Sequence, residues 1–170
     1  MPNHVKNVLK FSNLSEQDKD FIVARFTNEF GTTLDFNAII PEPKIKSECP
    51  EDCLVNKDSH VQEDKDRPWF NWYTWHYKYW GTKWGAYDGY IITGKTWVQF
   101  VFSTAWATPL PIYQKLAQKY NFKFKVRYAD EDLGHNCGII IYNKDDFVHL
   151  HEDEIHQHPR NFAERLWNTY

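Results

Sequence analysis

A set of aromatic and polar residues has the types and the spacing that a small-molecule binding site needs. The predicted ligand-binding residues are Asn3, Trp80, Lys83, Trp84, Trp106, Tyr128, Asp130, Glu131, Asp132 and Asn136. Aromatic rings can stack on a flat ligand, while lysine, asparagine and carboxylate groups read base edges and ribose hydroxyls. We expect these residues to converge because each lies at a predicted strand end or in an adjoining loop. The alternative is that the acidic residues form a solvated turn and the tryptophans belong to the core.

Lys83 is the cation of this predicted site. It lies in the sequence WGTKW at 80–84, between two tryptophans. A cation beside aromatic rings is a contact that an anion or a nucleotide can use. The sequence therefore favours a pocket for a nucleotide-like small molecule.

Two other clusters suggest different chemistry. The acidic turn at 130–132 could hold magnesium, which would make the chain a metal-dependent nucleotide hydrolase. The sequence contains no Walker lysine loop, no HExxH and no nucleophile elbow, so we expect no catalytic residue and no cofactor. The pairs His149 with His151 and His156 with His158 have the alternate spacing of chelating histidines. A solvated, histidine-rich tail is the preferred interpretation, and we expect no metal.

Basic residues alternate along the first and last strands of the predicted sheet. They are Lys6, Lys10, Lys123, Lys125 and Arg127. If the two strands are neighbours, these side chains share one face, which favours nucleic-acid binding as a third hypothesis. Alternatively, the lysines protect an exposed edge from aggregation.

The elements that must position these residues follow from hydrophobic spacing. The predicted strands cover residues 4–11, 89–93, 96–104, 122–128 and 138–142. The predicted helices cover residues 16–30, the segment 68–84 as far as Gly81, the segment that Thr108 caps, and the segment after Asn161, which pairs with Glu164 in a capping-box pattern. Residues 35–43 predict a strand fragment or an extended loop, because two prolines exclude a helix there. This order predicts an α+β, ferredoxin-like (βαββαβ) antiparallel sheet, with an inserted aromatic helix, an extra C-terminal strand and a C-terminal helix.

The inserted helix is unusually aromatic. Residues 68–84 hold five of the eight tryptophans of the chain. As a helix, this segment is apolar over more than half of its circumference, whereas a surface helix normally has one apolar stripe. It must therefore be wrapped by the rest of the protein or present its rings to a ligand.

Composition sets broad limits. A chain of 170 residues predicts one domain, here 1–170 with a polar insertion at about 44–67, and its net charge of −3 favours no class of partner. Three cysteines make an odd count and predict free thiols. The sequence has neither a membrane-spanning apolar run nor a signal-peptide pattern, so we expect a cytoplasmic protein without a membrane partner.

Several short motifs occur in order along the chain. They are MPN at 1–3, IIPEP at 39–43, WGTKW at 80–84, STAW with its following proline at 103–109, and YADED through CG at 128–138. Together they resemble the YubB-type ferredoxin-like family, whose members are small proteins carried mainly by bacteriophages, plasmids and other mobile elements. The resemblance covers most of the chain, except the insertion at 44–67 and the tail after Tyr142. It implies a ferredoxin-like fold and a phage or mobile-element origin, and it implies no established activity.

These observations favour a small, non-enzymatic binding protein. The resemblance implies a role in countering host defence, in the cytoplasm of the host cell. The ligand would be a nucleotide-derived signal or a host defence protein. The alternatives are the hydrolase of the acidic turn and the nucleic-acid binder of the basic face.

Overall fold

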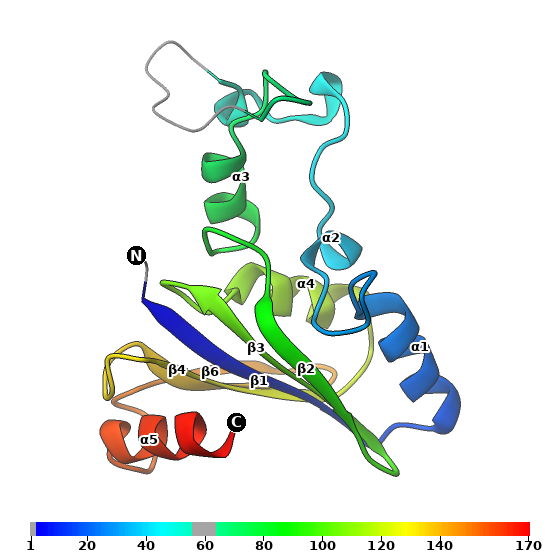
Figure 1. Ribbon diagram of the computed structural model, residues 1–170. Helices are drawn as coiled ribbons and strands as arrows, with labels where there is room; N and C mark the ends of the chain where they lie inside the picture. The colour runs from blue at the N-terminus through cyan, green and yellow to red at the C-terminus, as the bar shows by residue number, and fades with distance from the viewer. Residues whose placement is uncertain (1–2, 56–63) are drawn as a thin grey trace.

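The computed structural model contains one six-stranded antiparallel sheet with the strand order β2-β3-β1-β4-β5-β6 (Figure 1). The structure describes residues 3–55 and 64–170. The strands are β1 His4–Ser12, β2 Tyr87–Thr93, β3 Trp97–Ala105, β4 Phe124–Asp130, β5 Cys137–Tyr142 and β6 Phe147–His151. The helices are α1 Glu16–Phe26, α2 Phe36–Ile39, α3 Trp72–Tyr79, α4 Leu110–Lys119 and α5 Pro159–Thr169, with short 3₁₀ turns η1 Lys46–Glu48 and η2 Glu51–Cys53.

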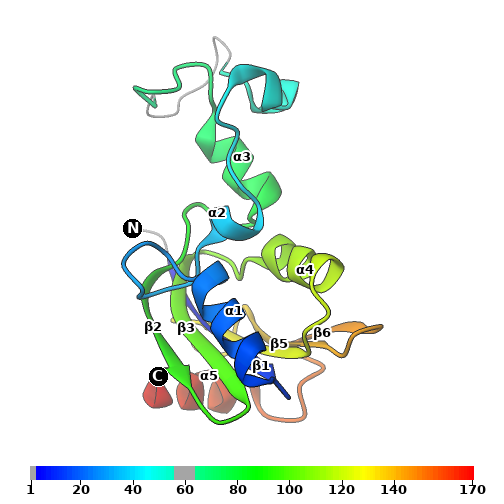
Figure 2. The same cartoon turned by 90° about the vertical axis from the view of Figure 1, so that its right-hand side faces the viewer.

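The inner part of this sheet has the ferredoxin-like arrangement that the sequence predicts. Helix α1 follows β1 and α4 follows β3, while β1 lies between β3 and β4. Helices α1, α2 and α4 cover one face, and α5 covers part of the other (Figure 2). The α+β fold with an antiparallel, ferredoxin-like sheet is therefore confirmed.

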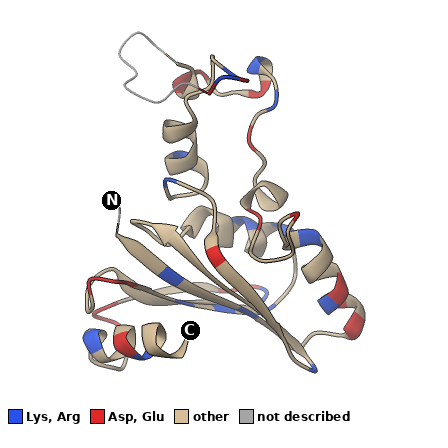
Figure 3. Cartoon of the chain, in the orientation of Figure 1, with Lys and Arg blue, Asp and Glu red and all other residues tan. Residues whose placement is uncertain are grey.

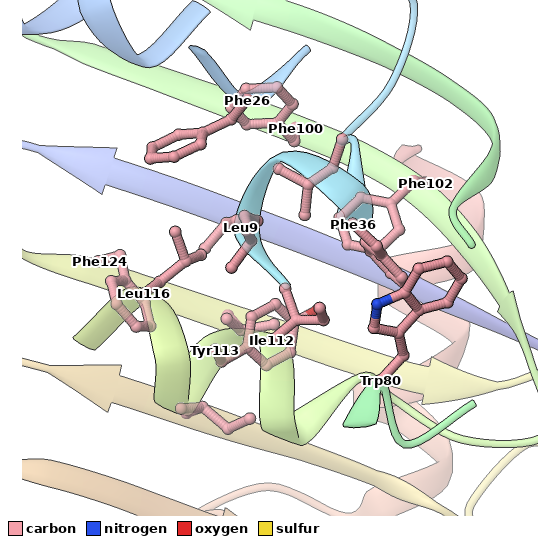
Figure 4. Packing of buried hydrophobic residues seen from close by; sticks show 14 of the residues in the cluster. Leu9, Phe26, Phe36, Trp80, Phe100, Phe102, Ile112, Tyr113, Leu116 and Phe124 are labelled. Carbon is pink, nitrogen blue, oxygen red and sulfur yellow. The ribbon is translucent and has the colours of Figure 1, made fainter. Parts of the chain in front are cut away.

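Alternation along β1 divides the protein into two cores. Val5, Leu9 and Phe11 point toward α1 and α4, where they join a large cluster of buried aromatic and aliphatic side chains (Figure 4). Val8 points the other way and packs with α5 in a smaller cluster around Phe162. Because side chains alternate between faces with period two, one strand serves both cores.

Helix α3 and the two 3₁₀ turns form an arm that rises from the helix side of the sheet (Figure 1). Asn71 caps α3, because its side chain accepts a hydrogen bond from the Thr74 backbone N–H at 3.1 Å. Trp75 and His76 are buried, and so is Trp80, at 3% exposure just beyond the helix end. The aromatic helix is thus shorter than predicted, and part of it is core.

Helix α1 ends four residues earlier than residues 16–30 predicted, at Phe26. Thr27 leaves the helix in an extended conformation and forms a bridge with Leu34, which pulls the chain back toward α2. The extended segment predicted at 35–43 is also wrong in part. Asp35 caps the short helix α2 because its carboxylate accepts from the Asn37 backbone N–H at 2.9 Å.

Three further details near the C-terminal half differ from prediction. The polar stretch after Tyr142 contains the sixth strand, β6, which pairs with β5. Thr108 does not cap α4, because its hydroxyl donates to the buried Asn7 side chain at 2.7 Å. Asn161 is not a cap either, since α5 begins after His158 and Glu164 pairs with Arg160.

The predicted insertion at 44–67 contains η1 and η2, and its residues 56–63 lie outside the described part of the chain. The three cysteines, Cys49, Cys53 and Cys137, are free thiols, as predicted. Among the described residues, no helix has the length and apolar character required to cross a bilayer.

Candidate functional site

Most of the predicted site residues meet at one end of the sheet. Asp130 lies at their centre and is 5% exposed. Its carboxylate accepts hydrogen bonds from the side chains of Asn3 at 3.1 Å and Asn136 at 3.0 Å, and from the Asp132 backbone N–H at 2.9 Å. Asp130 therefore holds the start of β1 against the turn that joins β4 to β5.

Trp106 is held just after β3 by the same group of residues. Its backbone N–H donates to the Asn3 carbonyl at 2.9 Å, and its carbonyl accepts from the Asn136 side chain at 2.9 Å. Trp106 has a φ of +67°, in the left-handed region that costs a residue with a side chain about 1–2 kcal/mol. Such strain in a bulky, exposed residue is typical of functional sites.

In the loop after α3, Gly81 and Thr82 pack inward, and the next two residues point outward. Gly81 has a φ of +78° and lies so close to Pro111 that an added Cβ would be 2.6 Å from its Cδ. The Thr82 hydroxyl donates to the Ala105 carbonyl at 2.7 Å. These two contacts fix the loop against the sheet and turn Lys83 and Trp84 outward.

Lys83 is the cation between two exposed rings. Its Nζ lies 4.8 Å from the ring centroid of Trp84 and 5.0 Å from that of Trp106. These rings are 39% and 40% exposed. Within residues 3–55 and 64–170, Lys83 forms no ion pair with a carboxylate. The rings contribute an attraction of about 0.5–2 kcal/mol but do not neutralise the charge.

The rings continue on both sides of Lys83 as an aromatic strip, which we define as Tyr77, Trp106, Lys83, Trp84 and Tyr87. Tyr77 stacks on Trp106 with a centroid separation of 6.2 Å, and Tyr87 meets Trp84 edge to face at 6.3 Å. Burial, together with nearby acidic residues, raises the pKa of Tyr87 to about 12. The strip therefore presents neutral rings and one positive charge at neutral pH.

His76 supports the aromatic strip by contacting the loop that carries Lys83. Its Nδ1 lies 2.8 Å from the Lys83 carbonyl oxygen, and its Nε2 lies 2.5 Å from the Glu42 carboxylate. The imidazole therefore links the loop that carries Lys83 to the Glu42 carboxylate. The ring also stacks on Trp80 at a centroid separation of 4.1 Å.

Glu42 connects this histidine to the arm. Its second oxygen lies 2.7 Å from Arg67 Nη2. Burial alone would raise the pKa of Glu42, but the hydrogen bonds from His76 and Arg67 outweigh it and hold the pKa below its usual value. Sequence reasoning missed Glu42, Arg67 and His76 as site residues. The IIPEP and WGTKW motifs were the available signal, because this network joins them.

A cleft adjoins this network, and Glu42 is one of its lining residues. It has a volume of about 540 Å³ and lies between the strap of residues 40–50 and α3. Pro41, Pro43 and Tyr79 are among its lining residues, and none of the predicted site residues lines it.

Two predicted site residues, Trp80 and Tyr128, belong to the hydrophobic core. Trp80 belongs to the core, where its Nε1 donates to the Ile40 carbonyl at 2.9 Å. Tyr128 is 3% exposed and hydrogen-bonds to His149 at 2.7 Å. Both are at the correct end of their elements, but they point into the protein.

The remaining acidic and histidine residues form no metal site in the described part of the chain. No group of at least three His, Cys, Asp or Glu side chains there has metal-binding geometry. Glu131 accepts from the His4 backbone N–H at 2.9 Å. His149 and His151 share one face of β6 with a ring separation of 4.0 Å, whereas His156 and His158 are exposed in the turn that follows.

Comparison with known proteins identifies one family. The family described as "Ferredoxin-like domain in Api92-like protein" matches residues 79–169, from the end of α3 to the end of α5, which is more than half of the chain. No curated protein and no solved structure matches the sequence. The expected ferredoxin-like family is confirmed, while the YubB-type grouping and a phage origin stay predictions.

Proposed function

We propose that this chain, which belongs to the family of ferredoxin-like domains in Api92-like proteins, is a binding protein for an anionic ligand with a flat ring. A nucleotide is the ligand class that fits best. The observation that carries the proposal is that Lys83 lies between two exposed tryptophan rings. Among the described residues, its ammonium group has no carboxylate partner.

The chemistry of the strip matches the parts of a nucleotide. A base can stack on Trp84 or Trp106, which is worth about 1–3 kcal/mol per base. A phosphate can supply the counter-charge that Lys83 lacks. The exposed carboxylate of Asp132 could accept hydrogen bonds from ribose hydroxyls. It adjoins Asp130, whose hydrogen bonds help to hold Trp106 in place.

The carboxylates of the acidic turn are poorly suited to hydrolysis with magnesium. Both oxygens of Asp130 already accept hydrogen bonds, and the residue is buried. One oxygen of Glu131 holds the start of β1. Magnesium at this turn would have to replace contacts that hold the sheet together, so we favour binding without turnover.

We further propose that the protein sequesters a nucleotide-derived signal in the cytoplasm of a bacterial host and so counters host defence. This role rests on the resemblance of the motifs to phage and mobile-element proteins. A host protein docked on the aromatic strip is the second candidate. The length of the strip favours it, because aromatic residues are common energetic anchors at protein interfaces.

Mass spectrometry of small molecules released from the purified, denatured protein tests the proposal, together with a thermal-shift screen of linear and cyclic nucleotides. We expect a nucleotide that is released chemically unchanged and raises the melting temperature. In Trp84→Ala and Lys83→Ala, affinity should fall about tenfold or more, since about 1.4 kcal/mol corresponds to tenfold. Lys115→Ala, an exposed lysine on α4, is the matched control and should bind normally.

Two results would overturn the binding hypothesis in different ways. A nucleotide returned in hydrolysed form, with turnover lost in Asp132→Ala, would favour the enzyme. If no nucleotide were released and none shifted the melting temperature, the nucleotide site would be rejected and the protein partner would become the better candidate.

A further inference from the structure

The sheet face opposite α1 and α4 carries a second concentration of positive charge. We define the basic face as Lys6, Lys10, Lys125 and Arg127, which alternate along the neighbouring strands β1 and β4. The register places Lys10 directly opposite Lys125, and Val8 directly opposite Arg127. Lys123, which the sequence grouped with them, precedes β4.

This arrangement is unfavourable for the isolated protein. Like charges directly opposite each other on paired strands are destabilising. Within the described residues, no member of the basic face forms an ion pair with a carboxylate. The chain as a whole has a net charge of −3, so the basic face is a local concentration of positive charge. A general excess of positive charge in the protein therefore does not explain it.

Helix α5 covers only part of the basic face. Lys6 lies over the Trp167 ring at 4.7 Å, and Arg127 donates to the Tyr170 hydroxyl at 2.8 Å. The half of the sheet toward the tip of the β2–β3 hairpin extends beyond α5 (Figure 1). Lys10 and Lys125 lie in that uncovered half, and Lys125 is exposed.

An aromatic ring lies beside these two lysines. Lys10 Nζ is 4.2 Å from the ring centroid of Trp97 on β3. Gln99, which pairs with Lys10 across the strands, and the 37% exposed Ile92 complete the surroundings. Figure 3 shows basic positions on the inner strands of the sheet and an acidic position on β2, at the end toward the arm.

We propose that this uncovered half of the basic face binds single-stranded nucleic acid. Phosphates would contact Lys10 and Lys125, and a base would stack on Trp97. An uncovered sheet face with a partly exposed ring suits unstacked bases, because every base has a π face, whereas paired bases are inaccessible to the ring. This surface lies on the opposite side of the sheet from the arm, so it is independent of the aromatic strip.

The test is fluorescence anisotropy with fluorescein-labelled oligouridine and oligothymidine of roughly 12 nucleotides, a length within the usual site sizes. Binding should weaken between about 50 and about 200 mM salt, with a log–log slope of about −1.4, because each of the two phosphates neutralised by Lys10 and Lys125 contributes about −0.7 on a single strand. The double variant Lys10→Glu with Lys125→Glu should lose about tenfold or more in affinity at the lower salt concentration. Trp97→Ala should weaken binding, and Trp97→Phe, which keeps a ring, should restore most of it.

The matched control is Lys115→Glu with Lys119→Glu, which makes the same change in net charge on exposed positions of α4. It should bind as the natural protein does, and circular dichroism should show that all variants are folded. Equal losses in the control and the β1–β4 variant would overturn the proposal, as would binding that salt does not change. Equal affinity for a duplex of the same length would reject the single-stranded site.

Discussion

Trp106 shows at the scale of one residue how strain and exposure point to function. Its left-handed backbone, with a φ of +67°, costs free energy, and its ring is 40% exposed although it stacks on Tyr77. Glycine adopts this conformation without penalty. Relief of this strain should offset part of the lost ring packing, so we predict that Trp106→Gly lowers the free energy of unfolding by less than about 2 kcal/mol, while nucleotide affinity falls about tenfold or more.

Urea unfolding and isothermal titration calorimetry measure the two effects separately. Phe36→Gly, which removes a fully buried ring, is the control for a structural aromatic and should lose about 3–5 kcal/mol of stability. A comparable loss of stability in Trp106→Gly would show that the residue is held for packing rather than for binding.

At the scale of the elements, Asn7 joins β1 to its neighbours. Its side-chain oxygen accepts from the hydroxyls of Thr108 at 2.7 Å and Tyr113 at 3.1 Å, and its Nδ2 donates to Thr104 Oγ1 at 2.8 Å. The residue is 0% exposed. Asn7→Ala leaves several buried polar groups without a partner, each at a cost of about 1–3 kcal/mol, so we predict a loss of about 2–4 kcal/mol.

The midpoint of urea unfolding measures this loss, and Asn161→Ala, at an exposed position on α5, is the matched control. If the free energy of unfolding of Asn7→Ala were within about 0.5 kcal/mol of that of the control, this would mean that water replaces the missing amide.

The helices and strands also show which features of the fold the sequence patterns could predict. The strands were predictable because their side chains alternate, as in β4, where Phe124, Val126 and Tyr128 are all buried. The end of α1 was not, since Phe30 continues the helical spacing although it is 78% exposed. Strand β6 was missed because it is only five residues long and lies in an otherwise polar, histidine-rich stretch, although Val148 and Leu150 alternate with His149 and His151.

From the sequence, we could predict only which strand ends meet at the candidate site. Antiparallel pairing brings Asn3, Trp106 and Asp130 together, and the sequence order of the strands implies this. Which rings point outward depends on contacts that no spacing reveals. Thr82 bound to the Ala105 carbonyl turns Lys83 outward, whereas Trp80 enters the core.

At the scale of the whole molecule, Glu42 couples the arm to the aromatic strip. The carboxylate holds His76 at 2.5 Å and Arg67 at 2.7 Å, and His76 in turn holds the Lys83 carbonyl. Glu42→Gln removes the negative charge but keeps the shape. Hydrogen bonds to charged groups contribute about 1.5–3 kcal/mol, so we predict a loss of about that size at neutral pH and weaker nucleotide binding through the displaced Lys83 loop.

The pH dependence of this loss identifies its cause. The pKa of Glu42 is lower in the folded protein than in the unfolded chain, so its contribution is complete above the unfolded value of about 4.3 and is lost as the pH falls through the folded value. The difference in unfolding free energy between the natural protein and Glu42→Gln should therefore shrink between about pH 5 and pH 3. Glu164→Gln, which removes an exposed ion pair with Arg160, should change stability by less than about 0.5 kcal/mol throughout. A difference for Glu42→Gln that stays constant down to pH 3 would show that shape, rather than charge, connects the arm to the sheet.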